Sequence, residues 1–143
     1  MLTARQLLQQ KPDTSIISVA PSATVFEALQ VLAVKNVGAV LVMENGVLEG
    51  VFSERDYARR LVLEGKASVT TQVCDIMTTK VCYVPPTQTV SECMALMTEK
   101  RIRHLPVMEG TTVLGVVSIG DVVRATIDEQ AFTIEQLTHY ISH

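Results

Sequence analysis

The chain has 143 residues, of which 48% are hydrophobic, with a formal net charge of −3 and a pI near 5.6. A chain of this length removes roughly 68–70% of its unfolded surface from water, so it folds as one domain without a disulfide or a metal. The acidic balance argues against a protein that binds a nucleic-acid backbone, because such domains are usually basic.

The cysteines and the first residues indicate the cellular compartment. Cys74, Cys82 and Cys93 are odd in number and lack CxxC spacing, which predicts reduced, mostly buried thiols rather than a disulfide framework or a zinc site. Residues 1–10 carry one arginine and no apolar run typical of a signal peptide. No stretch approaches the roughly 20 apolar residues that span a bilayer. We therefore expect a cytoplasmic protein with no membrane contact.

Most of the chain consists of two copies of one unit, since Val19–Val62 aligns with Val84–Ile127 at a constant offset of 65 residues without a gap. Matching positions include Pro21/Pro86, Thr24/Thr89, Gly50/Gly115, Ser53/Ser118 and Asp56/Asp121. One copy cannot bury its apolar face alone, so we expect the copies to complete each other's core in one pseudo-symmetric domain. The predicted boundaries are 1–68 for repeat one, 69–127 for repeat two and 128–143 for a helical tail.

Each copy opens with a short apolar strand, predicted over residues 16–19 in the first copy and 81–84 in the second. A threonine then lies three residues before a glutamate, at Thr24–Glu27 and Thr89–Glu92, which is the capping-box signature of a helix start. Apolar residues recur at helical spacing behind each cap and predict a core-facing side for each helix. They are Val25, Leu29 and Leu32 in the first copy and Val90, Met94 and Met97 in the second.

A hairpin follows each of these helices. In the first copy the apolar run Ala39–Met43 ends at Asn45-Gly46, a strong hairpin signal, and Val47–Phe52 returns as the partner strand. The corresponding segments of the second copy are Leu105–Met108, the turn at Glu109-Gly110, and Val113–Val117. A second helix is predicted to begin near Ser53 or Ser118, so the order strand, helix, strand, strand, helix occurs twice.

Each second helix opens with a serine three residues before an aspartate, at Ser53 and Asp56 and at Ser118 and Asp121. A serine at the N-cap accepts a bond from a free backbone N–H, and the helix dipole favours an acid in the first turn. In the simplest interpretation, both aspartates only cap helices. In the functional interpretation, an ionised carboxylate here accepts both hydroxyls of a ribose diol, and the serine and free N–H groups hold a phosphate.

The element order and these motifs resemble the CBS-domain family, specifically a tandem pair, or Bateman module, of the small stand-alone type. The resemblance covers about residues 3–127. Its most specific parts are Gly50–Asp56 (GVFSERD), Gly115–Asp121 (GVVSIGD), Asp75–Thr78 (DIMT) and Arg103–Val107 (RHLPV). The resemblance implies an α+β fold in which two pseudo-symmetric β-α-β-β-α repeats pack sheet to sheet as one module, plus a C-terminal helix.

CBS pairs typically bind adenosine nucleotides through this aspartate and serine or threonine. The resemblance therefore implies a regulatory module that binds an adenine nucleotide such as AMP, ATP or NAD, needs no metal, and passes its occupancy to an unknown partner protein. The implied clefts lie between the repeats, with Asp121 facing the Val37-Gly38 corner and Asp56 facing the Ile102-Arg103 corner. The implied ligand-binding residues are Ile16, Ser18, Val37, Gly38, Ala39, Ser53, Arg55, Asp56, Thr79, Lys80, Val81, Tyr83, Arg103, His104, Pro106, Ser118, Ile119, Gly120 and Asp121.

The two repeats differ in the positive charge that they offer to a phosphate. Repeat one has Arg55 inside the motif and Arg59 and Arg60 one turn on, whereas repeat two has Gly120 in place of Arg55. In adenylate-sensing relatives, a basic pair at the position of Arg103-His104 faces the phosphates, so the resemblance implies that role here. The alternative is that this pair is a solvated strand entrance. We expect the two clefts to be inequivalent.

The tail carries an apolar stripe at helical spacing. Its members are Phe132, Ile134, Leu137, Tyr140 and Ile141. In the simplest interpretation this helix packs back on the module. Alternatively it helps a homodimer to form, and the resemblance implies that two modules assemble into a flat disc. His139 and His143 have no carboxylate or cysteine at ligand spacing, which predicts no metal role for them.

Motifs of catalysis do not occur in the sequence, which lacks a nucleophile elbow, a P-loop and a dinucleotide GxGxxG, so we expect no enzyme. The rival hypothesis is a ligand-independent scaffold, a constitutive homodimer whose SxxD motifs only cap helices. For nucleic-acid binding the sequence offers only a local basic edge from Lys100 to His104.

Overall fold

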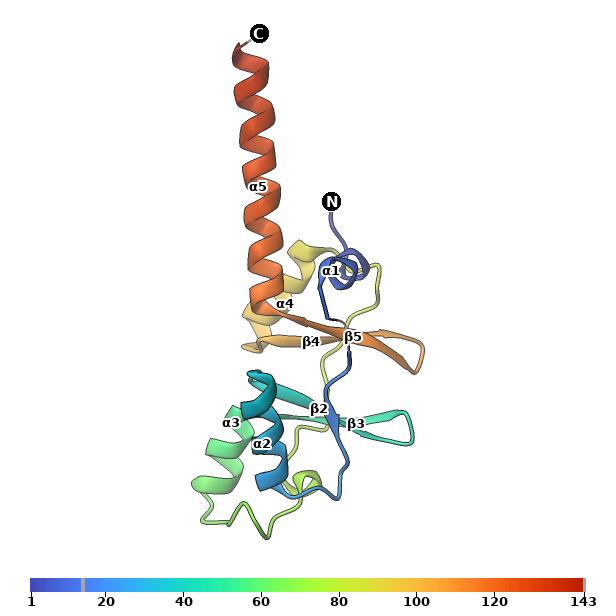
Figure 1. Ribbon diagram of the computed structural model, residues 1–143, viewed down its shortest axis with the longest axis vertical. Helices are drawn as coiled ribbons and strands as arrows, with labels where there is room; N and C mark the ends of the chain where they lie inside the picture. The colour runs from blue at the N-terminus through green and yellow to red at the C-terminus, as the bar shows by residue number, and fades with distance from the viewer. Residues whose placement is uncertain (14, 143) are drawn as a thin grey trace. The chain divides into compact units, whose positions relative to one another are not determined.

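The structure, a computed structural model, describes residues 1–13 and 15–142, so His143 lies outside the described residues (Figure 1). It divides into two compact units. The repeat-one unit comprises residues 15–82 and 110–112, and the repeat-two unit comprises residues 1–14, 83–109 and 113–143. The boundaries expected at residues 68 and 127 follow the sequence repeat and stay a prediction, because the compact units are assembled from different segments.

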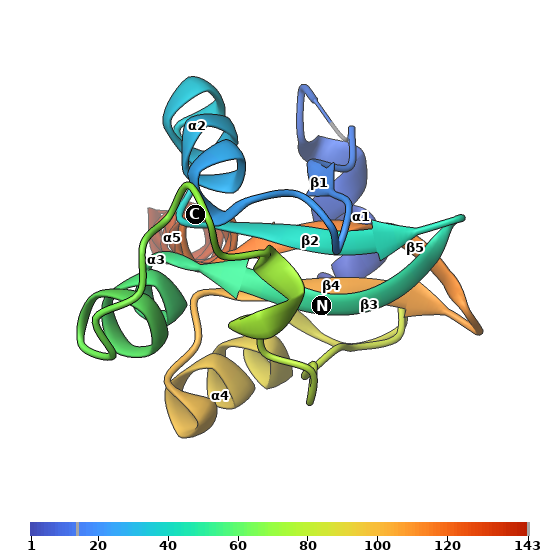
Figure 2. The ribbon, with the colours of Figure 1, turned by 90° about the horizontal axis from the view of Figure 1, so that it is seen from below.

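The repeat-one unit is a three-stranded sheet with helical segments. Its elements are β1 (Ser18–Val19), α2 (Val25–Lys35), β2 (Ala39–Glu44), β3 (Val47–Ser53), α3 (Glu54–Asp56), the π-helical turn η1 (Tyr57–Val62) and the 3₁₀ turn η2 (Val73–Asp75). β1 pairs in parallel with β2, and β2 pairs with β3 in antiparallel (Figure 2). The predicted element order is confirmed, although the first strand is shorter than expected.

Local sequence sets the ends of these elements. Thr24 caps α2 by accepting the N–H of Glu27, and Asn36 ends the helix in the left-handed conformation. Asn45 and Gly46 both have positive φ, at 52° and 78°, which a two-residue hairpin with the right twist requires. The helix N-cap at Thr24 and the hairpin turn predicted for this repeat therefore lie where the sequence indicates, although only the Thr24 half of the capping box is formed.

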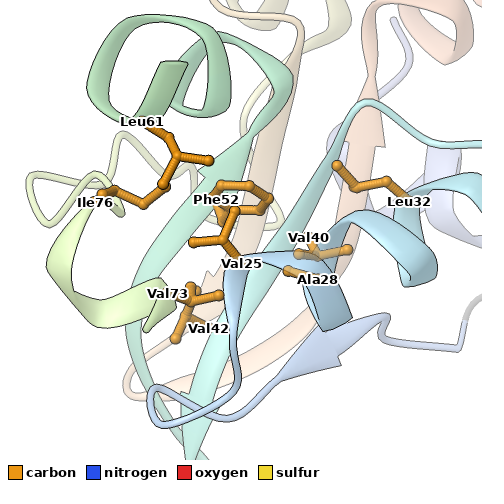
Figure 3. Close-up of a cluster of buried hydrophobic side chains, with 9 residues drawn as sticks. All are labelled: Val25, Ala28, Leu32, Val40, Val42, Phe52, Leu61, Val73 and Ile76. Carbon is orange, nitrogen blue, oxygen red and sulfur yellow. The ribbon is translucent and has the colours of Figure 1, made fainter. Parts of the chain in front are cut away.

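The core of the repeat-one unit lies on one face of the sheet (Figure 3). Val40 and Val42 point to the same face because they are two residues apart on β2, and Phe52 lies opposite Val40 in the ladder. The buried cluster is Val25, Ala28, Leu32, Val40, Val42, Phe52, Leu61, Val73 and Ile76. Because β3 ends at Ser53 and α3 begins at Glu54, the SxxD motif of this repeat lies at the end of the packed sheet.

The repeat-two unit has the same order of strands and helices, but its first strand pairs over a shorter length. Its elements are α1 (Ala4–Gln10), α4 (Val90–Lys100), β4 (His104–Glu109), β5 (Thr112–Ser118) and α5 (Ile119–Ser142). The strand predicted over 81–84 is reduced to one parallel bridge between Val84 and Val107. Pro85 and Pro86 follow at once, and they have no N–H with which to extend the ladder.

The tail forms one continuous helix with the second helix of repeat two, because α5 runs for 24 residues and residues 128–142 contain no glycine or proline (Figure 1). The expectation that the tail packs back on the module is wrong. The side chains of its predicted stripe are 57–81% exposed. An apolar stripe identifies the face that a helix can bury but not the surface that covers it.

The three cysteines are free thiols, but only Cys93 on α4 is buried, whereas Cys74 and Cys82 are half-buried. The expectation of mostly buried thiols is therefore wrong for two of them. Burial, with a smaller contribution from the charge of Glu92, raises the pKa of the Cys93 thiol.

Each repeat is completed by the segment that precedes the other repeat. We call residues 2–11 and 71–80 the lead-in segments. Val90 N, at the start of α4, donates to Leu2 O at 2.9 Å, and Ala4 N donates to Gln88 O at 2.8 Å. The matching bonds of the repeat-one unit are Val25 N to Thr71 O and Val73 N to Ala23 O, both 2.8 Å. The same backbone pairing therefore attaches a lead-in segment to each repeat.

We predict that Gly50→Ala destabilises the protein more than Gly115→Ala, although both glycines occupy the same repeat position. A Cβ at Gly50 would lie 2.8 Å from the backbone oxygen of Thr78, whereas at Gly115 the nearest atoms belong to the end of the Leu8 side chain, the closest at 2.9 Å. Overpacking of this kind costs about 1–3 kcal/mol. Denaturant unfolding of the two variants measures the difference, and an equal or larger loss for Gly115→Ala would contradict it.

Candidate functional site

Both SxxD motifs form the same helix cap. Ser53 Oγ accepts the N–H of Asp56 at 3.3 Å, and Asp56 Oδ2 accepts the N–H of Ser53 at 2.9 Å. In the repeat-two unit the corresponding distances between Ser118 and Asp121 are 3.1 and 2.9 Å. Each aspartate is therefore a structural cap, whatever else it binds.

The Asp56 carboxylate is almost fully enclosed, with the residue 6% exposed. Its Oδ1 accepts the hydroxyl of Thr78 at 3.0 Å, and its Oδ2 also accepts the hydroxyl of Ser53 at 3.0 Å. Arg60 lies 4.0 Å from Oδ1 and donates to the backbone oxygen of Met77 at 2.9 Å. A ligand would have to displace Thr78 to reach this carboxylate.

The Asp121 carboxylate is held by a cation instead. Lys11 Nζ lies 3.0 Å from Asp121 Oδ2 and donates to Val116 O at 2.9 Å. Arg124 lies farther away, 3.8 Å from Oδ1. Burial by itself raises the pKa of Asp121, but the bonds from Ser118 and the charge and bond of Lys11 outweigh it, so the pKa lies below its usual range. Asp121 is therefore ionised at neutral pH, and Oδ1 is its less engaged oxygen.

The residues that distinguish the two caps come from the lead-in segments. Thr78 supplies a neutral hydroxyl in one unit and Lys11 supplies an ammonium in the other. Sequence comparison missed both, because residues 3–11 align with residues 72–80 at an offset of 69 rather than 65. Four additional residues before Val19 hide this correspondence from a gapless alignment. The matching bonds at Leu2 and Thr71 reveal it.

The predicted ligand-binding residues are divided between the two units. The repeat-one unit holds Ile16, Ser18, Val37, Gly38, Ala39, Ser53, Arg55, Asp56, Thr79, Lys80 and Val81. The repeat-two unit holds Tyr83, Arg103, His104, Pro106, Ser118, Ile119, Gly120 and Asp121. Within the units, Glu54 N donates to Gly38 O at 3.1 Å and Ile119 N donates to Arg103 O at 2.8 Å. Each predicted corner therefore adjoins the motif of its own repeat.

Individual residues differ in how accessible they are. Arg55, Lys80, Tyr83 and Arg103 are exposed, whereas Pro106 is buried and its backbone oxygen accepts the N–H of Val84 at 3.0 Å. In the repeat-one unit an open pocket of about 600 Å³ lies between α2 and the start of α3. Its lining residues are Leu29, Leu32, Ala33, Asn36, Val37, Gly38, Glu54 and Tyr57. The predicted Val37-Gly38 corner thus borders an open, partly apolar hollow.

Two further classes of site are absent from the part of the chain that the structure describes. No group of three histidine, cysteine or acidic residues there is placed to hold a metal ion. Nor does any helix over residues 1–13 and 15–142 have the length and apolar character needed to cross a membrane.

Comparison with known proteins gives consistent matches. The model of a family described as CBS domain matches residues 4–63 and 73–128. The chain is 42% identical over 123 residues to the mitochondrial CBS domain-containing protein CBSX3 of Arabidopsis thaliana, covering 82% of this chain but only 60% of that relative.

Solved structures match the fold over most of its length. A signal-transduction protein with CBS domains from Burkholderia ambifaria, described as putative, has a TM-score of 0.86 and 46% identity, covering 90% of this chain and 96% of that one. The CBS domain pair of protein MJ0100, in complex with 5′-methylthioadenosine and S-adenosyl-L-methionine, has a TM-score of 0.75 at 21% identity. The match covers 87% of this chain and 99% of that one, and at this identity it shows the fold alone.

We predict that Lys11→Met destabilises the protein by roughly 1–2 kcal/mol at pH 7, between the values of an exposed ion pair and a charged hydrogen bond. The folded-state pKa of Asp121 is lowered, so the stabilisation is complete above the unfolded-state pKa near about 4 and is lost as the pH falls through the folded-state value. Denaturant unfolding at pH 7 and in acid measures the loss, which should shrink in acid.

Lys66→Met is the matched control, because Lys66 pairs with Glu64 at 3.3 Å while the two side chains are 44% and 54% exposed. It should change stability by less than about 0.5 kcal/mol. A loss for Lys11→Met that persists undiminished in acid would mean that the methionine disrupts packing rather than an ion pair.

Proposed function

Since the chain belongs to the CBS domain family, we propose that it is a non-catalytic regulatory module that binds an adenine nucleotide and passes its occupancy to a partner protein. The observation that carries the proposal is the ionised carboxylate of Asp121 at the start of α5, with its Oδ1 lightly engaged. Such an acceptor suits the paired hydroxyls of a ribose.

The surroundings of Asp121 also suit a phosphate. The start of α5 provides the positive end of a long helix dipole. Arg103 is exposed and adjoins this helix start, because its backbone oxygen accepts the N–H of Ile119. We assign Arg103 and its neighbour His104 to the phosphate.

The repeats are proposed to differ in use. The enclosed Asp56 favours the scaffold hypothesis for repeat one, because both of its oxygens are already bonded within the protein. Asp121 remains the better candidate. Its partner Lys11 carries a positive charge, which also attracts the negative charge of a phosphorylated ligand. We therefore propose that the repeat-two motif dominates nucleotide binding.

The ligand class is supported by the MJ0100 structure, since a protein of this fold holds two adenosine-containing compounds. AMP, ATP and NAD contain the same adenosine group as these two compounds. Selectivity of the protein among the three ligands would therefore depend on the charge of their phosphate groups. A homodimer, an unidentified regulated partner and a cytoplasmic location are further parts of the proposal, although the relative from Arabidopsis thaliana is named as mitochondrial.

The first test is a thermal-shift screen with AMP, ADP, ATP, NAD and S-adenosylmethionine, followed by calorimetry of Asp121→Asn. A ligand that binds only the folded state adds about 2.7 kcal/mol at a hundredfold excess over its Kd. The amide should weaken binding by about 1.5–3 kcal/mol for the lost charged hydrogen bond. Asp128→Asn is the control, because Asp128 is an exposed acid on the same helix and should bind as the parent does.

Two results would count against the proposal. An unchanged melting temperature across millimolar concentrations of every compound would reject nucleotide binding. An unchanged affinity in folded Asp121→Asn would reduce this aspartate to a helix cap.

The second test separates phosphate from base. Arg103→Ala should weaken AMP or NAD binding and reduce its salt dependence, because an accessible ion pair is screened as the Debye length falls to about 8 Å at physiological salt. Adenosine binding should remain nearly unchanged. Titrations of AMP and adenosine at low and high salt measure this, with Lys100→Ala as a control that removes one nearby exposed charge. Equal losses for AMP and adenosine in Arg103→Ala would place the phosphate elsewhere.

A further inference from the structure

The exposed side of α5 carries a regular stripe, which we call the α5 seam. Its members follow one another at spacings of four, three, four, three and four residues, and they are Val123, Ile127, Gln130, Ile134, Leu137 and Ile141. The five apolar members are between 41% and 81% exposed. An average spacing of 3.5 residues keeps a stripe facing one partner helix along its whole length.

Different residue types occupy the two alternating positions of the α5 seam. Ile127, Ile134 and Ile141 occupy the a position of the heptad, and Val123, Gln130 and Leu137 occupy the d position. β-branched residues at a with leucine at d favour two parallel strands. Gln130 has both a donor and an acceptor, so two copies satisfy each other when they lie in the same register.

Charge on this part of α5 also suits a second copy of the same chain. The charged residues between 126 and 142 are Asp128, Glu129 and Glu135, all acidic and at the b and c positions away from the seam. The flanking e and g positions hold Arg124, Thr126, Ala131, Thr133, Thr138 and Tyr140, of which Arg124, at the start of the seam, is the one charged residue. Identical acidic helices can therefore meet along the α5 seam without placing like charges opposite each other.

The seam is separate from the packing of α5 within its own unit. Val122 and Ala125 are buried, and Glu129 accepts the N–H of Leu2 at 3.1 Å, so these residues form the inward side. Beyond them α5 extends past the rest of its unit (Figure 1). We propose that the α5 seam joins two copies of this chain in a parallel two-stranded coiled coil, in which the paired Gln130 residues fix the register.

Sedimentation over a range of concentrations tests the interface in the full chain. Ile134→Asp should raise the dimer Kd at least tenfold, because it places two like charges opposite each other at an a position. Phe132→Asp is the matched control, since Phe132 and Ile134 are both 63% exposed but Phe132 lies at the f position on the other side. It should change the Kd less than twofold. Equal effects of the two variants, or none in either, would overturn the proposal.

Disulfide cross-linking tests the parallel arrangement. In a chain with Cys74→Ser and Cys82→Ser, Ile141→Cys should form a dimer disulfide with oxidised glutathione, because a parallel coil brings the two copies of this position together. An antiparallel coil pairs a with d positions, so it would place position 141 opposite position 123 and give none. His139→Cys, at the f position, should remain uncross-linked. Comparable cross-linking at 139 and 141, or none at 141, would contradict a parallel seam.

Discussion

The backbone bonds between each repeat and a lead-in segment are the constraint on which the rest of the structure depends. Val25 N and Val90 N begin α2 and α4, and the oxygens of Thr71 and Leu2 satisfy them. The same two segments carry the groups that reach the SxxD carboxylates, Thr78 and Lys11. Attaching a lead-in segment therefore completes a unit and sets the electrostatics of its motif in one step.

The two motifs consequently differ although their caps have the same geometry. Asp56 is buried and bonded to two neutral hydroxyls, with Arg60 4.0 Å away, whereas Asp121 is paired at 3.0 Å with the ammonium of Lys11 and keeps one lightly engaged oxygen. The difference arises outside the motif itself. In a duplicated unit of this kind, the segment before a repeat can change the chemistry of the site while the site residues stay the same.

Sequence patterns predicted the parts of the structure that depend on local physics. The caps at Thr24 and Thr89 and the turn at Asn45-Gly46 involve residues three or fewer positions apart, and such contacts follow from backbone geometry. Lys11 was not predicted because its partner Asp121 is distant in sequence. In addition, the lead-in segments align at an offset of 69 residues, whereas the rest of the two repeats align at 65. The tail was misplaced for a related reason, since an amphipathic pattern contains no information about the surface opposite it.

The pairing of each lead-in segment with the other repeat also determines when contacts can form while the chain is being synthesised. Residues 2–4 pair with residues 88–90, and Leu2 bonds to Glu129, 127 positions along the chain. Leu7 and Leu8, buried in the finished protein, therefore leave the ribosome long before their partners exist. Closing such long loops is entropically costly and slow. During synthesis α1 is therefore the helix that stays exposed longest to proteases and to other nascent chains.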